Sequence, residues 1–194
     1  MLSRRLLLAG SVACGLALRG ARPARAEAVM TDDGYYREPW FLESFLELPD
    51  DLAAAAENKK RLVIMWELRG CPYCRETHLV NFARPEIANY IKERFDVLQL
   101  NIVGSREVTD FDGEKLTEKQ FAQKYGVRGV PVFQFFPDSV AGLAAKPPRE
   151  REIARGQGYI EPEPFLAMFR FVADRAYEKG EVLSLPPSEK LSRP

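Results

Sequence analysis

The sequence predicts an α/β domain in which helices cover both faces of a mixed central sheet. Segments with helical and with strand-like hydrophobic periodicity alternate along the chain. Residues 62–66 form a nearly continuous apolar run, as expected of a strand that is buried on both faces. A Cys-Pro-Tyr-Cys motif follows this run and opens a helix, so reactive side chains are expected at one edge of the sheet.

Residues 1–26 have the features of an export signal. Arg4 and Arg5 form a charged start, an apolar stretch covers 6–18, and residues 24–26 form a small-x-small cleavage site. The apolar stretch is too short for a stable membrane span. The paired arginines resemble a twin-arginine signal, and an ordinary secretory signal stays open as the alternative. We therefore expect a periplasmic protein.

Removing this segment changes the charge balance of the chain. The 194 residues hold 28 basic and 28 acidic side chains, but five arginines and no acid lie in residues 1–26. The remaining body has 23 basic and 28 acidic side chains, a net charge of −5. A nucleic-acid binder needs a basic face, so nucleic acid is not an expected partner. The hydrophobic content of 46% suffices for one packed domain.

The first half of the body is expected to hold an arm followed by helices and strands. Residues 27–48 contain an aromatic cluster and are expected to form an N-terminal arm that packs on a domain covering 49–178. The acidic residues at 50–51 favour a helix start, because they lie near the positive end of its dipole. The elements expected next are strand 62–66, a helix opening at Cys71, a helix from Pro85 and a strand over 96–102.

The second half is expected to be richer in loops. Thr117 is a favourable cap for a short helix that ends near Tyr125. The last helix starts near Pro162 and has apolar residues spaced for one buried face. The other expected segments are a loop over 103–116, a strand over 130–136, a loop over 137–149, a strand over 150–159 and a flexible tail over 179–194.

Cysteine content points to redox chemistry. Cys14 belongs to the export signal, so Cys71 and Cys74 are the only thiols of the body. A disulfide between them closes a ring too small to stabilise the fold much, which makes reactivity the better explanation. The helix start favours the thiolate of Cys71, and Cys74, one turn later, can resolve a mixed disulfide. We predict Cys71 as the exposed nucleophile, Cys74 as the covered resolving thiol, and this redox-active disulfide as the only cofactor.

His78 and the two cysteines are also candidate metal ligands. One cysteine pair and one histidine are too few for a structural zinc site, so no metal site is assigned. Cu(I) held by Cys71, Cys74 and His78 stays open as a non-enzymatic function, because soft thiolates suit Cu(I). His78 itself is interpreted as a half-buried or surface side chain, with a proton shuttle for Cys74 as the alternative.

Val130-Pro131 is the second signal of a site. Proline within a strand-like apolar run removes a donor from the sheet and is normally avoided. A cis peptide bond would explain it and would expose the backbone of Val130 beside the cysteines. An extended substrate could then pair there like an added strand. Pro72 and Tyr73, between the cysteines, are expected to contribute to the same binding surface.

Taken together, residues 50–178 resemble the thioredoxin superfamily. The stretches GCPYCRETH, NIVGSREVTDFDGEKLTEKQFAQKYGV and ARGQGYIEPEPFLAMF resemble the periplasmic SoxW-type thioredoxins of bacterial sulfur-oxidation systems. The resemblance implies a thioredoxin fold, with Cys71 as nucleophile, Cys74 as resolving thiol and Pro131 in cis. It also implies a membrane thiol electron donor, and periplasmic proteins, among them a sulfur-carrier subunit, as disulfide substrates.

Three positions depart from the thioredoxin pattern. Pro-Tyr stands between the cysteines, as in glutaredoxins, where thioredoxins have Gly-Pro. Met65 stands where thioredoxins place a buried aspartate, and Glu67, on the same face of the strand, is a candidate substitute in a proton relay. An ordinary carboxylate at a strand end is the alternative for Glu67. Val130 before the proline provides an apolar lip.

The sequence thus predicts an exported thiol–disulfide oxidoreductase that acts as a reductase. A periplasmic oxidase or isomerase would use the same residues, because only the redox potential separates these activities. The Cu(I) delivery module is the non-enzymatic alternative. The sequence does not determine the oligomeric state.

Overall fold

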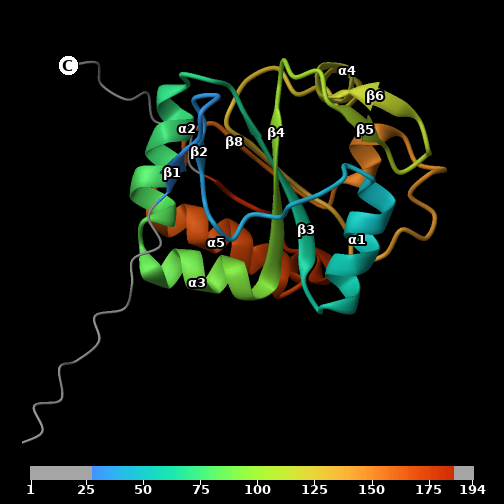
Figure 1. Ribbon diagram of the computed structural model, residues 1–194. Coiled ribbons are helices and arrows are strands. Elements are labelled where there is room, and N and C mark those ends of the chain that lie inside the picture. The colour runs from blue at the N-terminus through green and yellow to red at the C-terminus, as the bar shows by residue number, and fades with distance from the viewer. Residues whose placement is uncertain (1–27, 186–194) are drawn as a thin grey trace, which may run out of the picture.

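The computed structural model describes residues 28–185. The predicted export signal and residues 186–194 of the predicted tail lie outside the described residues. The central sheet has four strands in the order β4-β3-β7-β8, shown in Figure 1. Their bounds are β3 (Arg61–Glu67), β4 (Phe95–Asn101), β7 (Val132–Phe135) and β8 (Ala154–Gln157). β3 is parallel to β4 and antiparallel to β7, which is antiparallel to β8, so the sheet is mixed as predicted.

Helices pack on both faces of this sheet. The α-helices are α1 (Leu48–Glu57), α2 (Pro72–Glu76), α3 (Pro85–Arg94), α4 (Glu118–Lys124) and α5 (Pro162–Ala173). A π-helical segment, η1 (Thr77–Phe82), continues α2, and two 3₁₀ turns are η2 (Pro148–Arg151) and η3 (Ala176–Lys179). Core residues of α1 and α4 cluster on one face, and those of η1, α3 and α5 cluster on the other.

β3 is the central strand, and all seven of its residues are buried. Leu62, Ile64 and Trp66 contribute to the core beneath α1 and α4. Val63 and Met65 contribute to the core beneath α3 and α5. The alternation follows from the two-residue period of a strand, and burial of both sets confirms the prediction from the apolar run.

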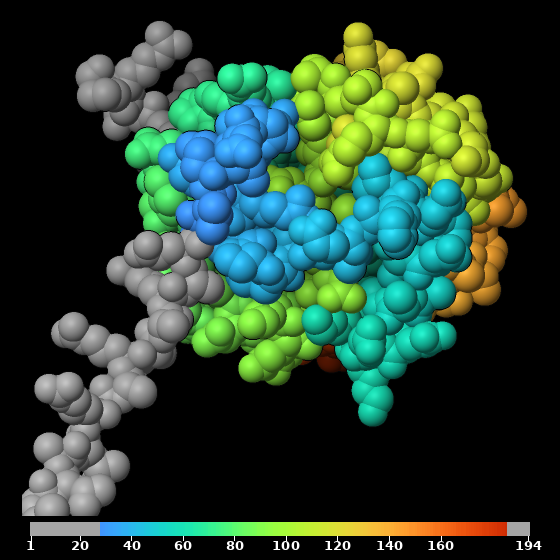
Figure 2. Space-filling view, in the orientation of Figure 1, coloured from blue at the N-terminus to red at the C-terminus, as the bar shows by residue number. Residues whose placement is uncertain are grey.

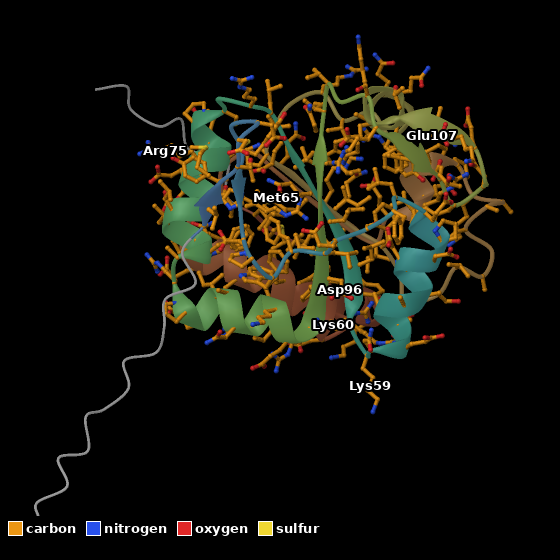
Figure 3. All side chains as sticks on the ribbon, viewed as in Figure 1. Lys59, Lys60, Met65, Arg75, Asp96 and Glu107 are labelled. Carbon is orange, nitrogen blue, oxygen red and sulfur yellow. The ribbon has the colours of Figure 1, made fainter. Side chains whose placement is uncertain are left out.

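An ion pair lies at the end of the sheet where β3 begins. The Lys60 ammonium lies 2.9 Å from a carboxylate oxygen of Asp96, and Figure 3 shows both side chains at that end. Lys59, on the turn before the strand, points away from the protein in the same view.

The predicted loop over 103–116 is wrong in part, because it contains most of a hairpin. β5 (Glu107–Thr109) pairs antiparallel with β6 (Lys115–Thr117). Strands of three residues are too short to show a clear alternation in sequence. The capping of α4 by Thr117 is confirmed. Its hydroxyl accepts a hydrogen bond from the backbone amide of Gln120, and the Gln120 side chain accepts one from the backbone amide of Thr117.

The predicted strand over 150–159 is shorter than expected. Its first residues form η2, and only Ala154–Gln157 pairs as β8. Arg151 in η2 is buried, and its guanidinium forms ion pairs with Asp110 and Asp112, both at 2.8 Å. These pairs join residues 41 and 39 positions apart and connect η2 to the turn between β5 and β6.

The segment over residues 28–46 packs against the edge of the sheet. It begins with a hairpin of β1 (Val29–Met30) and β2 (Tyr36–Arg37). The amide of Leu42 then donates to the carbonyl of Val97 in β4 at 2.9 Å, and Phe41 is buried. Figures 1 and 2 show the segment, in blue, passing in front of β4 from α2 towards α1.

The described part of the predicted tail also contacts the core. Leu183 and Leu185 are partly buried against the cluster beneath α3 and α5, so this stretch of the predicted flexible tail has contacts with the core at these two residues. Within residues 28–185, no helix is long and apolar enough to span a lipid bilayer.

An aromatic cluster under α5 provides a test of the fold. The Phe169 ring packs edge-on against Phe95, Phe133 and Phe135. We expect Phe169→Ala to lower the free energy of unfolding by about 3–5 kcal/mol, because it leaves a cavity in a packed core. Urea denaturation measures this loss. Phe171→Ala, a partly buried phenylalanine of the same helix, should cost much less, and equal losses would contradict this packing.

Candidate active site

The dithiol lies at the junction between the end of β3 and the start of α2. Gly70 turns the chain with φ of +74°, a conformation that glycine adopts without strain. Cys71 is the N-cap of α2, Pro72 occupies the first turn, where no backbone donor is needed, and the amide of Cys74 donates to the Cys71 sulfur at 3.2 Å. The local sequence therefore directs one sulfur toward the unpaired amides of a helix start.

The two thiols differ in exposure and acidity. Cys71 is partly exposed, whereas Cys74 is 4% exposed. A hydrogen bond from the Cys74 side chain lowers the pKa of Cys71 to about 7, against the effect of burial and with help from the backbone amides of Cys74 and Tyr73. The same hydrogen bond, burial and the charge of Glu67 raise the pKa of Cys74 well above its usual range. Cys71 therefore ionises readily to a thiolate near neutral pH, whereas Cys74 keeps its proton.

The Val130–Pro131 loop lies against the dithiol. The peptide bond between these residues is cis, and the carbonyl oxygen of Val130 lies 3.9 Å from the Cys71 sulfur. The carbonyl of Pro131 accepts the amide of Gly158 at 2.8 Å, which ties the loop to the end of β8. Because β3 and β7 are antiparallel neighbours, the end of one and the start of the other meet at the same edge of the sheet.

The residues between the cysteines face outward. Pro72 is exposed and Tyr73 is partly buried, so both are accessible beside Cys71. Figure 3 shows Arg75 pointing outward from α2, whereas Met65 lies in the interior. Met65 is therefore a core residue without a titratable group, at the position where the thioredoxin pattern has a buried aspartate.

A cavity of about 270 Å³ separates the dithiol from the β1–β2 hairpin. Its wall includes both cysteines and Glu67, which the sequence singled out. The hairpin contributes residues that sequence reasoning did not assign to the site, although the aromatic cluster had marked the segment. These hairpin residues are Met30, Gly34, Tyr35 and Tyr36.

Glu67 and His78 are in contact, and both are buried. Glu67 is 2% exposed and His78 is 1% exposed. The Nε2 atom of His78 lies 3.0 Å from Oε1 of Glu67, whose other oxygen accepts the side-chain amide of Gln99. The interpretation of His78 as a half-buried or surface side chain is wrong, because the rings of Tyr36, Phe41 and Phe82 enclose it. Glu67 is likewise no ordinary strand-end carboxylate.

Glu38 is the residue of this network that sequence reasoning missed. Its Oε1 lies 2.9 Å from Nδ1 of His78, and the side chain is 1% exposed. Burial opposes the charge of His78, but hydrogen bonds to Glu38 and Glu67 outweigh it and raise the pKa of His78 to about 9. A single acidic residue in an arm carries no sequence signal for such a partner. Because both ring nitrogens of His78 are engaged, the ring is not oriented to hold copper with the cysteines.

The arrangement can perform dithiol–disulfide exchange. It combines an activated thiolate, a covered resolving thiol and a buried carboxylate that borders the same cavity. A Cys-x-x-Cys helix start beside a cis-proline on a four-stranded mixed sheet defines the class of thioredoxin-fold proteins, and supports a thiol–disulfide oxidoreductase. Within residues 28–185, no group of three or more histidine, cysteine or acidic side chains is arranged to hold a metal ion.

The chain belongs to the family of thioredoxin-like domains, whose model matches residues 48–173. Solved structures share the fold. A thioredoxin-fold protein from Helicobacter pylori is 22% identical with a TM-score of 0.51, covering 66% of this chain and 85% of that one. A thioredoxin from Thermus thermophilus is 21% identical with a TM-score of 0.50, covering 70% of this chain and 90% of that one. No curated protein matches the chain in sequence.

The hydrogen bond between the thiols provides a test of the site. In protein carrying Cys14→Ser, replacing Cys74 with alanine removes this donor, so we expect the pKa of Cys71 to rise from about 7 by about one unit, toward the usual thiol value. The thiolate fraction at neutral pH falls accordingly. Cys74→Ser keeps a donor and should cause a smaller rise. Ultraviolet titration of the thiolate measures both, and equal rises would contradict this cause.

Proposed function

We propose that this protein is an exported reductase that transfers two electrons from the Cys71–Cys74 dithiol to disulfides of periplasmic partner proteins. The asymmetry of the two thiols is the observation that carries the proposal. The partly exposed Cys71 sulfur, with a pKa of about 7, can attack a partner's disulfide as a thiolate. The buried Cys74 thiol keeps its proton and so reacts only after the mixed disulfide has formed.

The reaction proceeds in two exchanges. The Cys71 thiolate attacks one sulfur of the partner's disulfide, forms a mixed disulfide and releases the other sulfur as a thiolate. Cys74 then loses its proton and attacks the Cys71 sulfur, which releases the partner's second thiolate. The partner gains two electrons, and the protein is left with the Cys71–Cys74 disulfide. Glu67 is the proposed acceptor of the Cys74 proton, because it is buried and borders the same cavity.

The binding surface surrounds Cys71. The backbone of Val130 and the adjacent Pro131 offer an edge for an extended segment of the partner, since the Val130 carbonyl lies next to the nucleophile. Pro72 and Tyr73 flank the sulfur on the helix side. The partner's cysteine would therefore lie between the Val130–Pro131 loop and the start of α2.

The pKa of Cys71 favours reduction over oxidation. The pKa of about 7 is close to that of the reducing cysteine of thioredoxin and far above the value of about 3.5 in the oxidant DsbA. A less stabilised thiolate makes the dithiol a better electron donor. This comparison supports the reductase over an oxidase or isomerase that would use the same residues.

The setting of the reaction is proposed from the sequence. The signal-like residues 1–26 support export, and the SoxW-type stretches support a role in sulfur oxidation, with a sulfur-carrier subunit among the substrates. A reductase outside the cytoplasm needs a supply of electrons, which a membrane thiol donor would provide by reducing the Cys71–Cys74 disulfide.

The reduction potential tests the direction of electron flow. For protein carrying Cys14→Ser, we expect a reduction potential near that of thioredoxin, about −270 mV, and below about −200 mV. Equilibration with glutathione or dithiothreitol buffers measures it. A value near about −120 mV would make the protein an oxidant and would end the reductase proposal.

Trapping tests the exchange with partner proteins. Cys74→Ser removes the resolving thiol, so we expect disulfide-linked adducts on Cys71 to accumulate in the periplasm of the source cell. Non-reducing electrophoresis and mass spectrometry would detect them and identify the partners. Cys71→Ser is the matched control and should form none. Absence of adducts with Cys74→Ser, or equal adducts in both variants, would count against Cys71 as the nucleophile.

A further inference from the structure

Three buried side chains join the N-terminal arm to the redox site. Glu38, His78 and Glu67 lie in a row, with the imidazole between two carboxylates at 2.9 Å and 3.0 Å. They come from the arm, η1 and β3. The outer oxygen of Glu38, Oε2, is buried without a hydrogen-bond partner among the described residues. Burial of such a half-satisfied carboxylate is costly, and stability alone does not explain it.

The charges of this row decide how easily it takes up a proton. With His78 protonated between two carboxylates, the row carries one net negative charge. One further proton makes it neutral, which a buried site favours. If Glu38 carried no charge, the row would already be neutral, and a further proton would leave an uncompensated positive charge in the interior.

Resting on the function proposed above, we propose that Glu38 is a positioning residue of the redox site: by sharing the charge of His78, it leaves the Glu67 carboxylate free to accept the proton of Cys74. Glu67 and Cys74 border the same cavity, which provides the path. The raised pKa of His78, about 9, keeps the imidazole charged at neutral pH. The arm therefore completes the acid–base machinery of the dithiol.

The surroundings contain few other groups that could take this role. Gln99 of β4 donates to Glu67 and to the backbone carbonyl of Tyr36, and it does not titrate. Aromatic rings from the arm and η1 also contact His78. Within residues 28–185, the titratable and charged groups near the row are Cys71 and Cys74 at the start of α2 and Tyr35 and Tyr36 of the hairpin, with Arg75 at the cavity wall.

Ellman's reagent, an aromatic disulfide, separates the two exchanges. The Cys71 thiolate attacks it and releases one thionitrobenzoate. Cys74 gives its proton to Glu67, attacks the Cys71 sulfur and releases the second, so the dithiol loses two electrons and the reagent gains two. Stopped-flow absorbance records two phases, of which only the second depends on the proton acceptor. All variants carry Cys14→Ser, which leaves Cys71 and Cys74 as the only thiols.

We expect two substitutions to move the second phase in opposite directions. Glu38→Gln keeps an acceptor for His78 but removes a negative charge, so the pH profile of the second phase should shift to lower pH by about one unit and its plateau rate should fall. His78→Gln removes the positive charge between the carboxylates, so the profile should shift to higher pH. The first phase should change little in either variant.

Glu43→Gln is the matched control, because Glu43 lies in the same arm with an 88% exposed side chain. Its profile should match the unmodified protein. If the row had only a structural role, the pH profiles of both test variants would shift in the same direction. An unshifted Glu38→Gln profile would also overturn the inference. If the Glu38→Gln variant lost the first phase, the His78→Gln variant would decide the test by itself. A shift of its pH profile to higher pH would support the inference, and any other result would overturn it. Absence of a second phase in the unmodified protein would instead overturn the proposed function.

Discussion

The burial of β3 between two strands and two helical layers is the constraint on which the site depends. All seven residues of the strand are buried, and it pairs with β4 on one side and β7 on the other. Its end is therefore fixed in space, and the turn that follows places Cys71 at the start of α2. The antiparallel partner β7 begins at the same edge and brings the Val130–Pro131 loop to the sulfur. Sheet pairing therefore brings the proposed nucleophile and the proposed binding edge together.

The same strand carries a carboxylate into the core, and this determines what must surround it. Glu67 is satisfied by His78 and Gln99, and His78 in turn by Glu38. A second buried network, in which Arg151 pairs with Asp110 and Asp112, has a different position and chemistry. Its neighbours Phe111 and Tyr125 belong to the core on the opposite face of the sheet from Phe41 and Phe82, which enclose His78. That network joins η2 to the turn between β5 and β6, whereas Glu67 of the first network borders the cavity of the dithiol.

Local signals in the sequence predicted much of the fold. The apolar run of β3, the capping residue Thr117 and the apolar face of α5 each identified an element, because each reflects interactions within a few residues. The hairpin β5–β6 and the turn η2 were not predicted. Their formation depends on strand pairing over short segments and on ion pairs of Arg151 with residues about forty positions away.

The sequence by itself determined the dithiol motif, its place after a buried strand, and the proline that faces it, since spacing and turn chemistry encode these features. Only the tertiary structure decided which acid–base groups surround the dithiol. His78 pairs with residues 40 and 11 positions away, and the first of these lies in an arm whose docking no periodicity encodes. A buried charge finds its partners through the packing of whole elements, so the contact of Glu38 with His78 depends on the arm packing against β4.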